Sequence, residues 1–275
     1  VPLPSRRMAG LNLLAHAGRV GAAQAMQRSL CSNTEDRALH GKKALVFGGT
    51  SGIGLATVLQ LRAAGASVIA ISRDPERAHQ RAREEGQDLV GIELAQCDVQ
   101  DQAALSALFS AQAPFDVLVS SATGGGRAMG PFLDMDMAGY QASFAKLWGY
   151  ANVVRYGAAH LRDNSSITLV SGSPARRPRP GQVALASVGA AIEQFARTLA
   201  PELATRGIRI NVVSPGLIST PMFGRDPEAR DRKLNKITAN NLIPRPGTAS
   251  EVAQGIMFAV TNQFVTGTTV DVDGG

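Results

Sequence analysis

Three glycines at a fixed spacing form the pattern in this sequence that most directly indicates chemistry. Gly48, Gly52 and Gly54 follow the apolar run at 44–47 and precede a helix with apolar periodicity. A glycine after the strand permits a tight turn, and the later glycines let the backbone approach a pyrophosphate and let helix and strand pack closely. The free N–H groups at the start of the helix then face the phosphates. This order predicts a nucleotide site that includes the loop residues Gly48, Thr50, Ser51, Gly52, Ile53 and Gly54.

Ser72 and Arg73 end the second strand-like run, where an NAD-specific protein would carry an acid for the ribose hydroxyl. A hydroxyl and a guanidinium suit a 2′-phosphate, which a carboxylate would repel. NADP(H) is therefore predicted in preference to NAD(H), which is the alternative. Arg73 can also be read as a surface charge flanking a helix. Asp74 is predicted to cap the helix that begins at Pro75.

Strand-like and helical patterns alternate from Gly41 onward. Strands are predicted at 44–47, 67–71, 92–95, 117–119, 167–170, 208–213 and 268–272. Helices are predicted at 53–64, 75–85, 102–110, 140–161, 184–204 and 250–260. Repeated strand-then-helix units predict an α/β fold of the Rossmann type, a doubly wound, mostly parallel sheet in one domain over 41–275. Residues 220–247 interrupt this rhythm and are predicted to form either a mobile lid or a plain surface excursion.

Several further segments, together with the glycine spacing, resemble the short-chain dehydrogenase/reductase family over residues 41–275. Cys97-Asp98-Val99 is similar to the family's adenine-contacting pair, and Ile210 to Pro221 is similar to its segment beside the nicotinamide. Thr266 to Gly274 resembles its last strand. The resemblance implies a seven-stranded sheet, a homo-dimer or homo-tetramer, and a small-molecule substrate. It also implies further cofactor contacts from Asp98, Val99, Ser121, Ala122, Pro215, Gly216 and Thr220.

The proton-transfer residues of that family are missing from this sequence. The family uses Asn, Ser, Tyr and Lys, with Tyr as the acid or base and Lys lowering its pKa. Aligning 190–203 with the helix after the tyrosine puts Leu185 at the Tyr place and Gly189 at the Lys place, and the sequence contains no Tyr-x-x-x-Lys. The serine place falls at Gly172, and the helix asparagine place holds Lys146.

Four residues are the candidates for rearranged catalysis. Lys146 would act as an acid if it is partly desolvated beside the cofactor. Ser171 or Ser173 would hold the substrate oxygen, and Tyr150, one turn from Lys146, is a spare donor. The alternatives are a surface position for Lys146 and packing in the core or at an oligomer contact for Tyr150 and its neighbour Trp148.

These residues are compatible with three different functions. The first is an NADP(H)-dependent oxidoreductase acting on a small carbonyl, imine or enone by a non-standard proton route. The second is a catalytically silent sensor or scaffold subunit that binds the dinucleotide, and the third is a non-redox enzyme on the same fold. Retention of the Ile210-to-Pro221 segment beside the nicotinamide favours the first over the second.

Arginines in two predicted loops indicate what kind of substrate the protein could bind. Arg176, Arg177 and Arg179 lie in the proline-rich segment after the fifth predicted strand, and Arg127 follows the glycines at 124–126. Guanidiniums there would accept a carboxylate or phosphate of a substrate. A solvated charged loop is the alternative for the first three, and an ordinary surface position is the alternative for Arg127.

Composition excludes other classes of protein. The chain has 275 residues, 44% of them hydrophobic, and a formal net charge of +6. Its two cysteines, Cys31 and Cys97, and its four scattered histidines predict neither a disulfide framework nor a metal site. No basic stripe indicates nucleic acid, and no long apolar run indicates a membrane span. Residues 1–40, with five arginines and two acids, are predicted to be an extension or a transit peptide, which would place the protein in the cytoplasm or the mitochondrial matrix.

Overall fold

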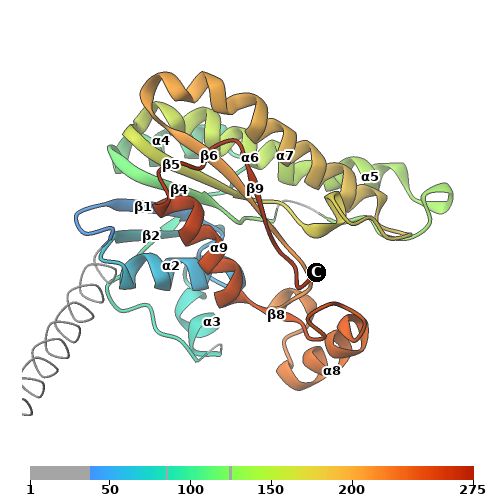
Figure 1. Ribbon diagram of the computed structural model, residues 1–275. Coiled ribbons are helices and arrows are strands. Elements are labelled where there is room, and N and C mark those ends of the chain that lie inside the picture. The colour runs from blue at the N-terminus through green and yellow to red at the C-terminus, as the bar shows by residue number, and fades with distance from the viewer. Residues whose placement is uncertain (1–37, 85, 124–125) are drawn as a thin grey trace, which may run out of the picture.

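A seven-stranded parallel sheet lies at the centre of the protein (Figure 1). The computed structural model describes residues 38–84, 86–123 and 126–275. Its strand order, β3-β2-β1-β4-β5-β6-β9, reverses between β1 and β4, and ligands of doubly wound sheets bind at such a reversal. The predicted fold class is confirmed. The strands are β1 (Lys43–Phe47), β2 (Ser67–Ser72), β3 (Glu93–Gln96), β4 (Phe115–Ser120), β5 (Leu161–Val170), β6 (Arg209–Pro215) and β9 (Thr269–Val272).

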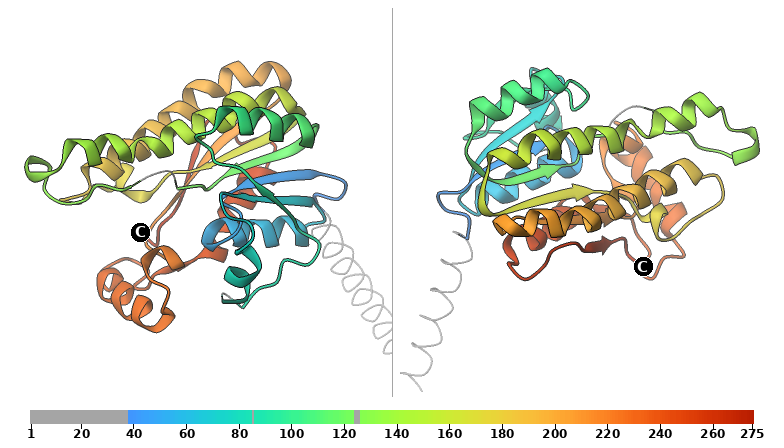
Figure 2. Two further views of the ribbon diagram at one scale, coloured as in Figure 1. Left: turned by 180° about the vertical axis from the view of Figure 1, so that it is seen from behind. Right: turned by 90° about the horizontal axis from the view of Figure 1, so that it is seen from above.

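Helices cover both faces of the sheet, as the alternation of strand and helix patterns predicts. In Figure 1, one set of helices lies above the sheet and another below it, and the left view of Figure 2 shows the same layers from behind. The upper set is α4 (Gln102–Gln112), α6 (Ala145–Gly157) and α7 (Val183–Leu203). The lower set is α2 (Gly52–Ala63), α3 (Ala78–Glu84) and α9 (Ala249–Thr261).

Alternate residues of the strands supply the two cores between these layers. Along β1, Leu45 and Phe47 belong to the core under α4, α6 and α7, whereas Ala44 and Val46 belong to the core over α2 and α9. Both faces of a parallel sheet are buried, so its strands are apolar at nearly every position. Each buried Leu or Phe stabilises the fold by about 1.5–3 kcal/mol. The two cores thereby fix the positions of the strand ends at which the site lies.

The helix predicted at 140–161 is divided in the structure. Phe144 alone separates helix α5 (Met137–Ser143) from α6, and the Ser143 hydroxyl donates to the Gly139 carbonyl oxygen (2.9 Å). A serine that bonds back onto the preceding turn tends to bend a helix. After α6, a short 3₁₀ turn (Ala158–His160) leads into β5, so Leu161 is a strand residue and not a helical one.

Helix α3 is shorter than predicted, and this corrects the expectation for Asp74. The helix begins at Ala78, and Asp74 pairs with Arg77 (3.5 Å) and Arg81 (3.1 Å). Its carboxylate therefore anchors arginine side chains beside the phosphate loop and does not cap a helix at Pro75.

Residues 220–247 form a small lobe at the carboxyl edge of the sheet (Figure 1). It contains α8 (Pro227–Thr238), whose N-cap Asp226 accepts a hydrogen bond from Glu228 N (3.1 Å), and a short 3₁₀ turn at Pro221–Phe223. Two short strands, β7 (Ile218–Ser219) and β8 (Gly247–Thr248), close the lobe at its base. The helix was not predicted, because the sequence of α8 is strongly polar and only Leu234 and Thr238 of it are buried.

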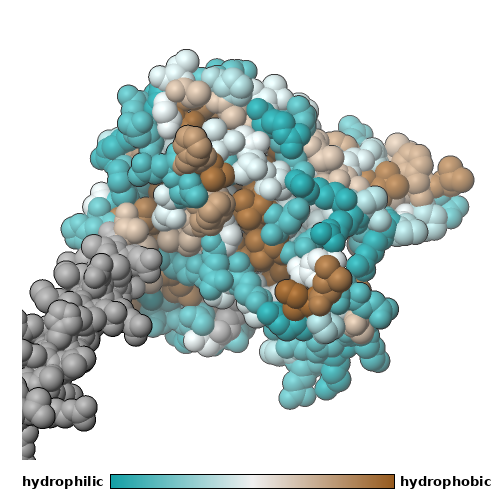
Figure 3. Space-filling view, viewed as in Figure 1, coloured by the Kyte–Doolittle hydropathy of each residue, from teal (hydrophilic) through white to brown (hydrophobic). Residues whose placement is uncertain are grey.

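A second projection carries α5 beyond the sheet on the other side of the same edge (Figure 2). Its end is hydrophobic on the surface, as the right-hand side of Figure 3 shows. The exposed apolar side chains of this projection are Met129, Phe132, Leu133 and Met137. None of the helices in the described part of the chain is both long enough and apolar enough to cross a membrane.

Candidate active site

The phosphate loop has the steric form that a dinucleotide requires. Gly48 has φ +76°, and a Cβ added there would lie 2.9 Å from Ala122 N. A Cβ on Gly54 would lie 2.1 Å from the Gly48 carbonyl oxygen, so only glycine fits at this position. The loop leads directly into α2, whose first N–H groups face the carboxyl edge of the sheet. This backbone cradle fits the pyrophosphate of NAD(P).

Other predicted cofactor residues lie around this loop. Ser121 ties the end of β4 to β1, since its backbone N–H and its hydroxyl both donate to the Phe47 carbonyl oxygen (3.0 and 3.1 Å). Thr220, from the segment after β6, approaches Gly52, whose added Cβ would lie 3.3 Å from the threonine methyl. The fold therefore brings together two cofactor candidates that lie far apart in the sequence.

The adenine side of the predicted site lies after β3. Asp98 accepts a hydrogen bond from Gln100 N (2.9 Å), which folds its side chain back over the turn. Val99 is buried, and a Cβ on Gly149 of α6 would lie 2.5 Å from its methyl group. Cys97 N donates to the Ser72 carbonyl oxygen (3.0 Å), so this turn borders the end of β2.

The end of β2 presents a hydroxyl and two arginines. Ser72 Oγ is buried and, among the described residues, has no hydrogen-bond partner. Arg73 is exposed. Arg81 of α3 donates to the Asp74 carbonyl oxygen (3.1 Å) and lies 3.4 Å from Thr50 Oγ1 of the phosphate loop. The unsatisfied hydroxyl and the arginines fit a ribose 2′-phosphate. Sequence reasoning missed Arg81, because only the packing of α3 brings it to the loop.

Gly216 is constrained by packing of the last strand. A Cβ there would lie 2.8 Å from both Cα and O of Asp273, and its N–H donates to the Val272 carbonyl oxygen (3.0 Å). Pro215, the last residue of β6, pairs with Val272 in β9. These contacts explain why glycine occurs at this position without any cofactor, and they hold the Pro215–Gly216 turn at the carboxyl edge.

Lys146 belongs to α6, and its ammonium group lies at the carboxyl end of β5. Its Nζ donates to the Ser171 carbonyl oxygen (3.0 Å) and lies 5.5 Å from the centre of the Tyr150 ring. Burial and, secondarily, the nearby positive charge of Arg127 lower the pKa of Lys146 to about 7. An amine with this pKa can give up a proton near neutral pH.

Tyr150 is a core residue in this structure. Its side chain is fully buried, and its hydroxyl donates to the Val170 carbonyl oxygen (3.0 Å). Burial raises the pKa of Tyr150 far above its ordinary value. This geometry matches the core-packing alternative and gives the tyrosine no free proton for a substrate. Its neighbour Trp148, in contrast, is 64% exposed.

The two serine candidates differ in their surroundings. The buried Ser171 hydroxyl donates to Glu193 Oε1 of α7 (3.1 Å). Burial raises the pKa of Glu193 in spite of this hydrogen bond and the neighbouring Arg176. Ser173 is half-buried at the start of a short 3₁₀ turn, and among the described residues its hydroxyl has no partner. Ser173 is therefore the serine whose hydroxyl is available to a ligand.

The positions aligned with the family's Tyr and Lys lie on α7. Leu185 is half-buried. Gly189 is buried and packs closely, because a Cβ there would lie 2.9 Å from Ala175 Cβ and 3.4 Å from the Gly172 carbonyl oxygen. Neither position carries an ionisable group.

The arginine-rich loop is largely paired with acids of its own chain. Arg176 lies 3.6 Å from Glu193 and 3.3 Å from Asp271, and Arg177 lies 2.9 Å from Asp273. Arg179 is exposed and takes part in none of the ion pairs of the described residues. The three guanidiniums thus do not form one anion site.

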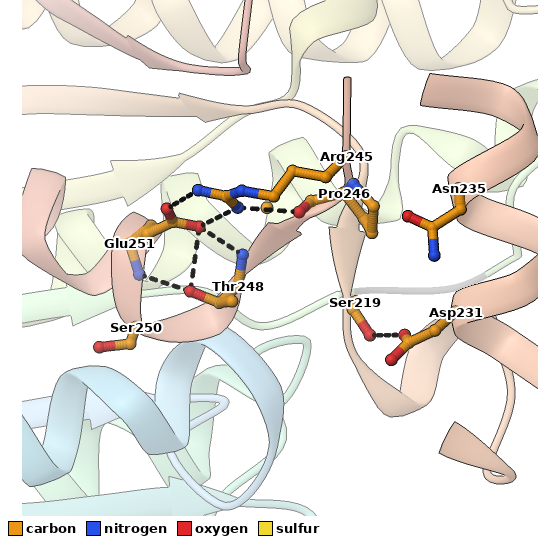
Figure 4. Close-up of a pocket in the computed structure, with 9 residues that line it drawn as sticks. Ser219, Asp231, Asn235, Arg245, Pro246, Thr248, Ser250 and Glu251 are labelled. Carbon is orange, nitrogen blue, oxygen red and sulfur yellow. Dashed lines mark hydrogen bonds and ion pairs between the residues drawn. The ribbon is translucent and has the colours of Figure 1, made fainter. Parts of the chain in front are cut away.

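An open pocket between α8 and α9 is a separate feature of the molecule (Figure 4). Its polar side chains pair with one another. Arg245 donates to Glu251 Oε2 (3.0 Å), and Ser219 donates to Asp231. The arginine lowers the pKa of Glu251 to about 2. These contacts brace the lobe against α9. In the parts of the chain that are described, no group of three or more His, Cys, Asp or Glu residues is placed to hold a metal.

Sequence comparisons match this chain to known oxidoreductases. The sequence profile of a family described as enoyl-(acyl carrier protein) reductase matches residues 48–275. L-xylulose reductase of Mus musculus is 31% identical over 250 residues, which cover 87% of this chain and 98% of that protein. The 3-oxoacyl-[acyl-carrier-protein] reductase of Thermotoga maritima is 33% identical over 248 residues, covering 86% of this chain and 98% of that protein.

Solved structures with the same fold include complexes with NADPH. A small-chain dehydrogenase in complex with NADPH is 30% identical, with a TM-score of 0.70 over 85% of this chain and 97% of that one. An NADPH-bound short-chain oxidoreductase from Pseudomonas aeruginosa PAO1, described as containing an atypical catalytic center, is also 30% identical. Its TM-score is 0.75 over 85% of this chain and 96% of that one.

Proposed function

The chain belongs to the short-chain dehydrogenase/reductase family of NAD(P)-dependent oxidoreductases, and on that premise we propose that it reduces a small carbonyl, imine or enone with NADP(H), using Lys146 as the acid. The observation that carries the proposal is the position of the Lys146 ammonium. It lies at the carboxyl end of β5, is partly desolvated, and is held by the Ser171 carbonyl oxygen at 3.0 Å.

The cofactor would be held by the carboxyl edge of the sheet. Gly48, Gly52 and Gly54, with Thr50, Ser51 and Ile53, would take the pyrophosphate over the start of α2. Ser72 and Arg73 would take the 2′-phosphate, which makes NADP(H) the preferred form. The adenine and nicotinamide ends would contact Asp98, Val99, Ser121, Ala122, Pro215, Gly216 and Thr220. The NADPH-bound relatives support this choice of cofactor.

NADPH, when bound, supplies the hydride that the substrate carbon accepts. Lys146 supplies the proton to the substrate oxygen or nitrogen, and its hydrogen bond to Ser171 O fixes the direction of the ammonium. The Ser173 hydroxyl, with no other partner among the described residues, orients the substrate oxygen. Ser171 contributes only through its carbonyl oxygen, which holds Lys146, because its hydroxyl is already bonded to Glu193. Tyr150 has no part in this scheme.

Titration of the protein with NADPH and NADH by calorimetry, followed by a screen of carbonyl, imine and enone substrates, tests the proposal. We expect tight NADPH binding, weaker NADH binding and NADPH oxidation with at least one substrate class. NADPH binding without turnover of any class would favour the silent-subunit alternative. Lack of binding of either dinucleotide would refute the proposed cofactor site.

A self-association surface supports the proposal of a homo-dimer or homo-tetramer. A groove between α6 and α7 on the outside of the molecule is lined mainly by apolar side chains, among them Leu147, Trp148, Phe195 and Leu199. The 64% exposure of Trp148 is unusual for a residue of this size, and aromatic residues are enriched at interfaces. We expect sedimentation equilibrium to give a dimer or tetramer and Trp148→Arg to shift it toward monomer. A wild-type monomer would contradict this.

A further inference from the structure

Two positive side chains, those of Arg127 and Lys146, lie near the proposed reaction centre, and neither forms an ion pair with an acid in the described part of the chain. Ala128 N donates to Ser143 Oγ (2.9 Å), which fixes the Arg127 segment beside the helix turn that leads to Lys146. Ser143 precedes Lys146 by about one helical turn. Arg127 is exposed, and its positive charge is the second cause, after burial, that lowers the pKa of Lys146.

Neither cation has a carboxylate partner among the residues that the structure describes. In the described part of the chain, no ion pair includes Arg127 or Lys146, and the Lys146 ammonium donates its hydrogen bond to a backbone oxygen, that of Ser171. Neighbouring arginines behave differently, since Arg176 and Arg177 are both paired with acids. An ammonium that is held half-buried beside a guanidinium is electrostatically unfavourable, and a bound anion would relieve this repulsion.

A third unpaired cation borders the same place. Gly130 N donates to the Gly181 carbonyl oxygen (2.9 Å), so the loop that contains Arg127 lies against the loop that contains Arg179. Arg179 is exposed and, among the described residues, forms no ion pair. Two loops, each with an arginine that forms no ion pair among the described residues, therefore lie against one another.

We propose that the substrate carries a carboxylate close to its reducible group, as a 2-oxo or 3-oxo acid does, and that Arg127 binds this carboxylate beside Lys146. The inference rests on the proposed reductase function. The planar fork of a guanidinium matches the two oxygens of a carboxylate. With its charge engaged by the carboxylate, Arg127 repels Lys146 less, so the lysine stays protonated until it gives its proton to the neighbouring oxygen. Arg179 at the rim draws the anion in by long-range attraction.

A non-reacting ternary complex separates this inference from the proposed function. The protein is first titrated with NADP⁺, and the saturated complex is then titrated by calorimetry with 2-oxopentanoate or with its methyl ester at low ionic strength. An oxidised cofactor and an oxidised substrate undergo no hydride transfer, so only binding is measured. The ester removes the charge and preserves the ketone.

We expect 2-oxopentanoate to bind about 10- to 100-fold more tightly than the ester, the range for one charge-assisted pair. Arg127→Gln should abolish this preference and leave the affinity for NADP⁺ unchanged, and salt should weaken the preference in the wild type. Arg155→Gln is the matched control, because Arg155 is exposed at the far end of α6.

Three results would count against the inference or its premise. Equal affinity for acid and ester, or no binding of either while NADP⁺ binds, would overturn the inference. A preference for the acid that survives in Arg127→Gln would overturn the assignment to Arg127. Failure of NADP⁺ and NADPH to bind would overturn the proposed function instead.

Discussion

The two halves of the carboxyl edge of the sheet differ in what determines which residue types they carry. In the half formed by β1, β2 and β4, backbone packing dictates the residue types, since Gly48 and Gly54 have no room for a side chain. In the half formed by β5, α6 and α7, the proposed chemistry depends on side chains rather than on backbone shape. Lys146 lies near the end of β5, and Leu185 and Gly189 stand on α7. Under the proposed function, cofactor binding depends on the shape of the backbone, whereas the proton route depends on individual side chains.

The largest expected effect separates the two halves directly. Lys146→Met removes the proposed acid and should reduce turnover by about 10²- to 10⁴-fold, the usual contribution of a general acid. NADPH affinity should stay within about twofold, because no cofactor contact is lost. Steady-state rates and calorimetry measure the two quantities. Unchanged turnover would remove Lys146 from the mechanism.

A substitution in the half formed by β1, β2 and β4 should weaken cofactor binding more than it affects the chemical step. Gly54→Ala places a Cβ 2.1 Å from the Gly48 carbonyl oxygen, so the loop must shift or open. We expect NADPH affinity to fall about 100-fold and the melting temperature to fall, since overpacking costs about 1–3 kcal/mol. Gly139→Ala is the control, because a Cβ there would meet its nearest neighbour at 3.4 Å. Normal NADPH binding by Gly54→Ala would contradict the steric account.

Discrimination between the two dinucleotides should change by a smaller factor. Arg73→Glu puts a carboxylate where the 2′-phosphate is expected, and NADPH affinity should fall about 10- to 100-fold with little change for NADH. Arg81→Gln should have the same direction and a smaller effect, because Arg81 is already paired with Asp74. Equal losses for NADPH and NADH in Arg73→Glu would refute its assignment to the phosphate.

The smallest effect concerns a residue that the sequence suggested as a donor. Tyr150→Phe deletes a buried hydroxyl that donates to the Val170 carbonyl oxygen. We expect the free energy of unfolding to fall by about 1–3 kcal/mol, as the carbonyl oxygen loses its partner, while turnover is unchanged. Chemical denaturation and steady-state rates measure the two. A large loss of turnover in a stable variant would return Tyr150 to the proton route.

The sequence predicted the local backbone around the phosphate loop better than the tertiary contacts around Lys146, for physical reasons. Strand β1 and the glycine loop were predictable because a short apolar run and glycine spacing are local properties. Helix α8 was not, because it buries little apolar surface. The break between α5 and α6 depends on a hydrogen bond made by Ser143, and the pairing of Ser171 with Glu193 depends on how α7 packs against β5. Such tertiary contacts leave no periodic signal.

The pH dependence of reduction tests the central claim, that Lys146 supplies the proton, most directly. The groups near Lys146 are Arg127 and Tyr150, with Glu193 behind Ser171. Only protonated Lys146 can act as an acid, so kcat/KM of the wild type should fall as pH rises through about 7, the pKa to which burial and Arg127 bring this amine. In Lys146→Met the slow residual rate should be independent of pH over this range. The same descending profile in the variant would show that another group supplies the proton and would contradict the account.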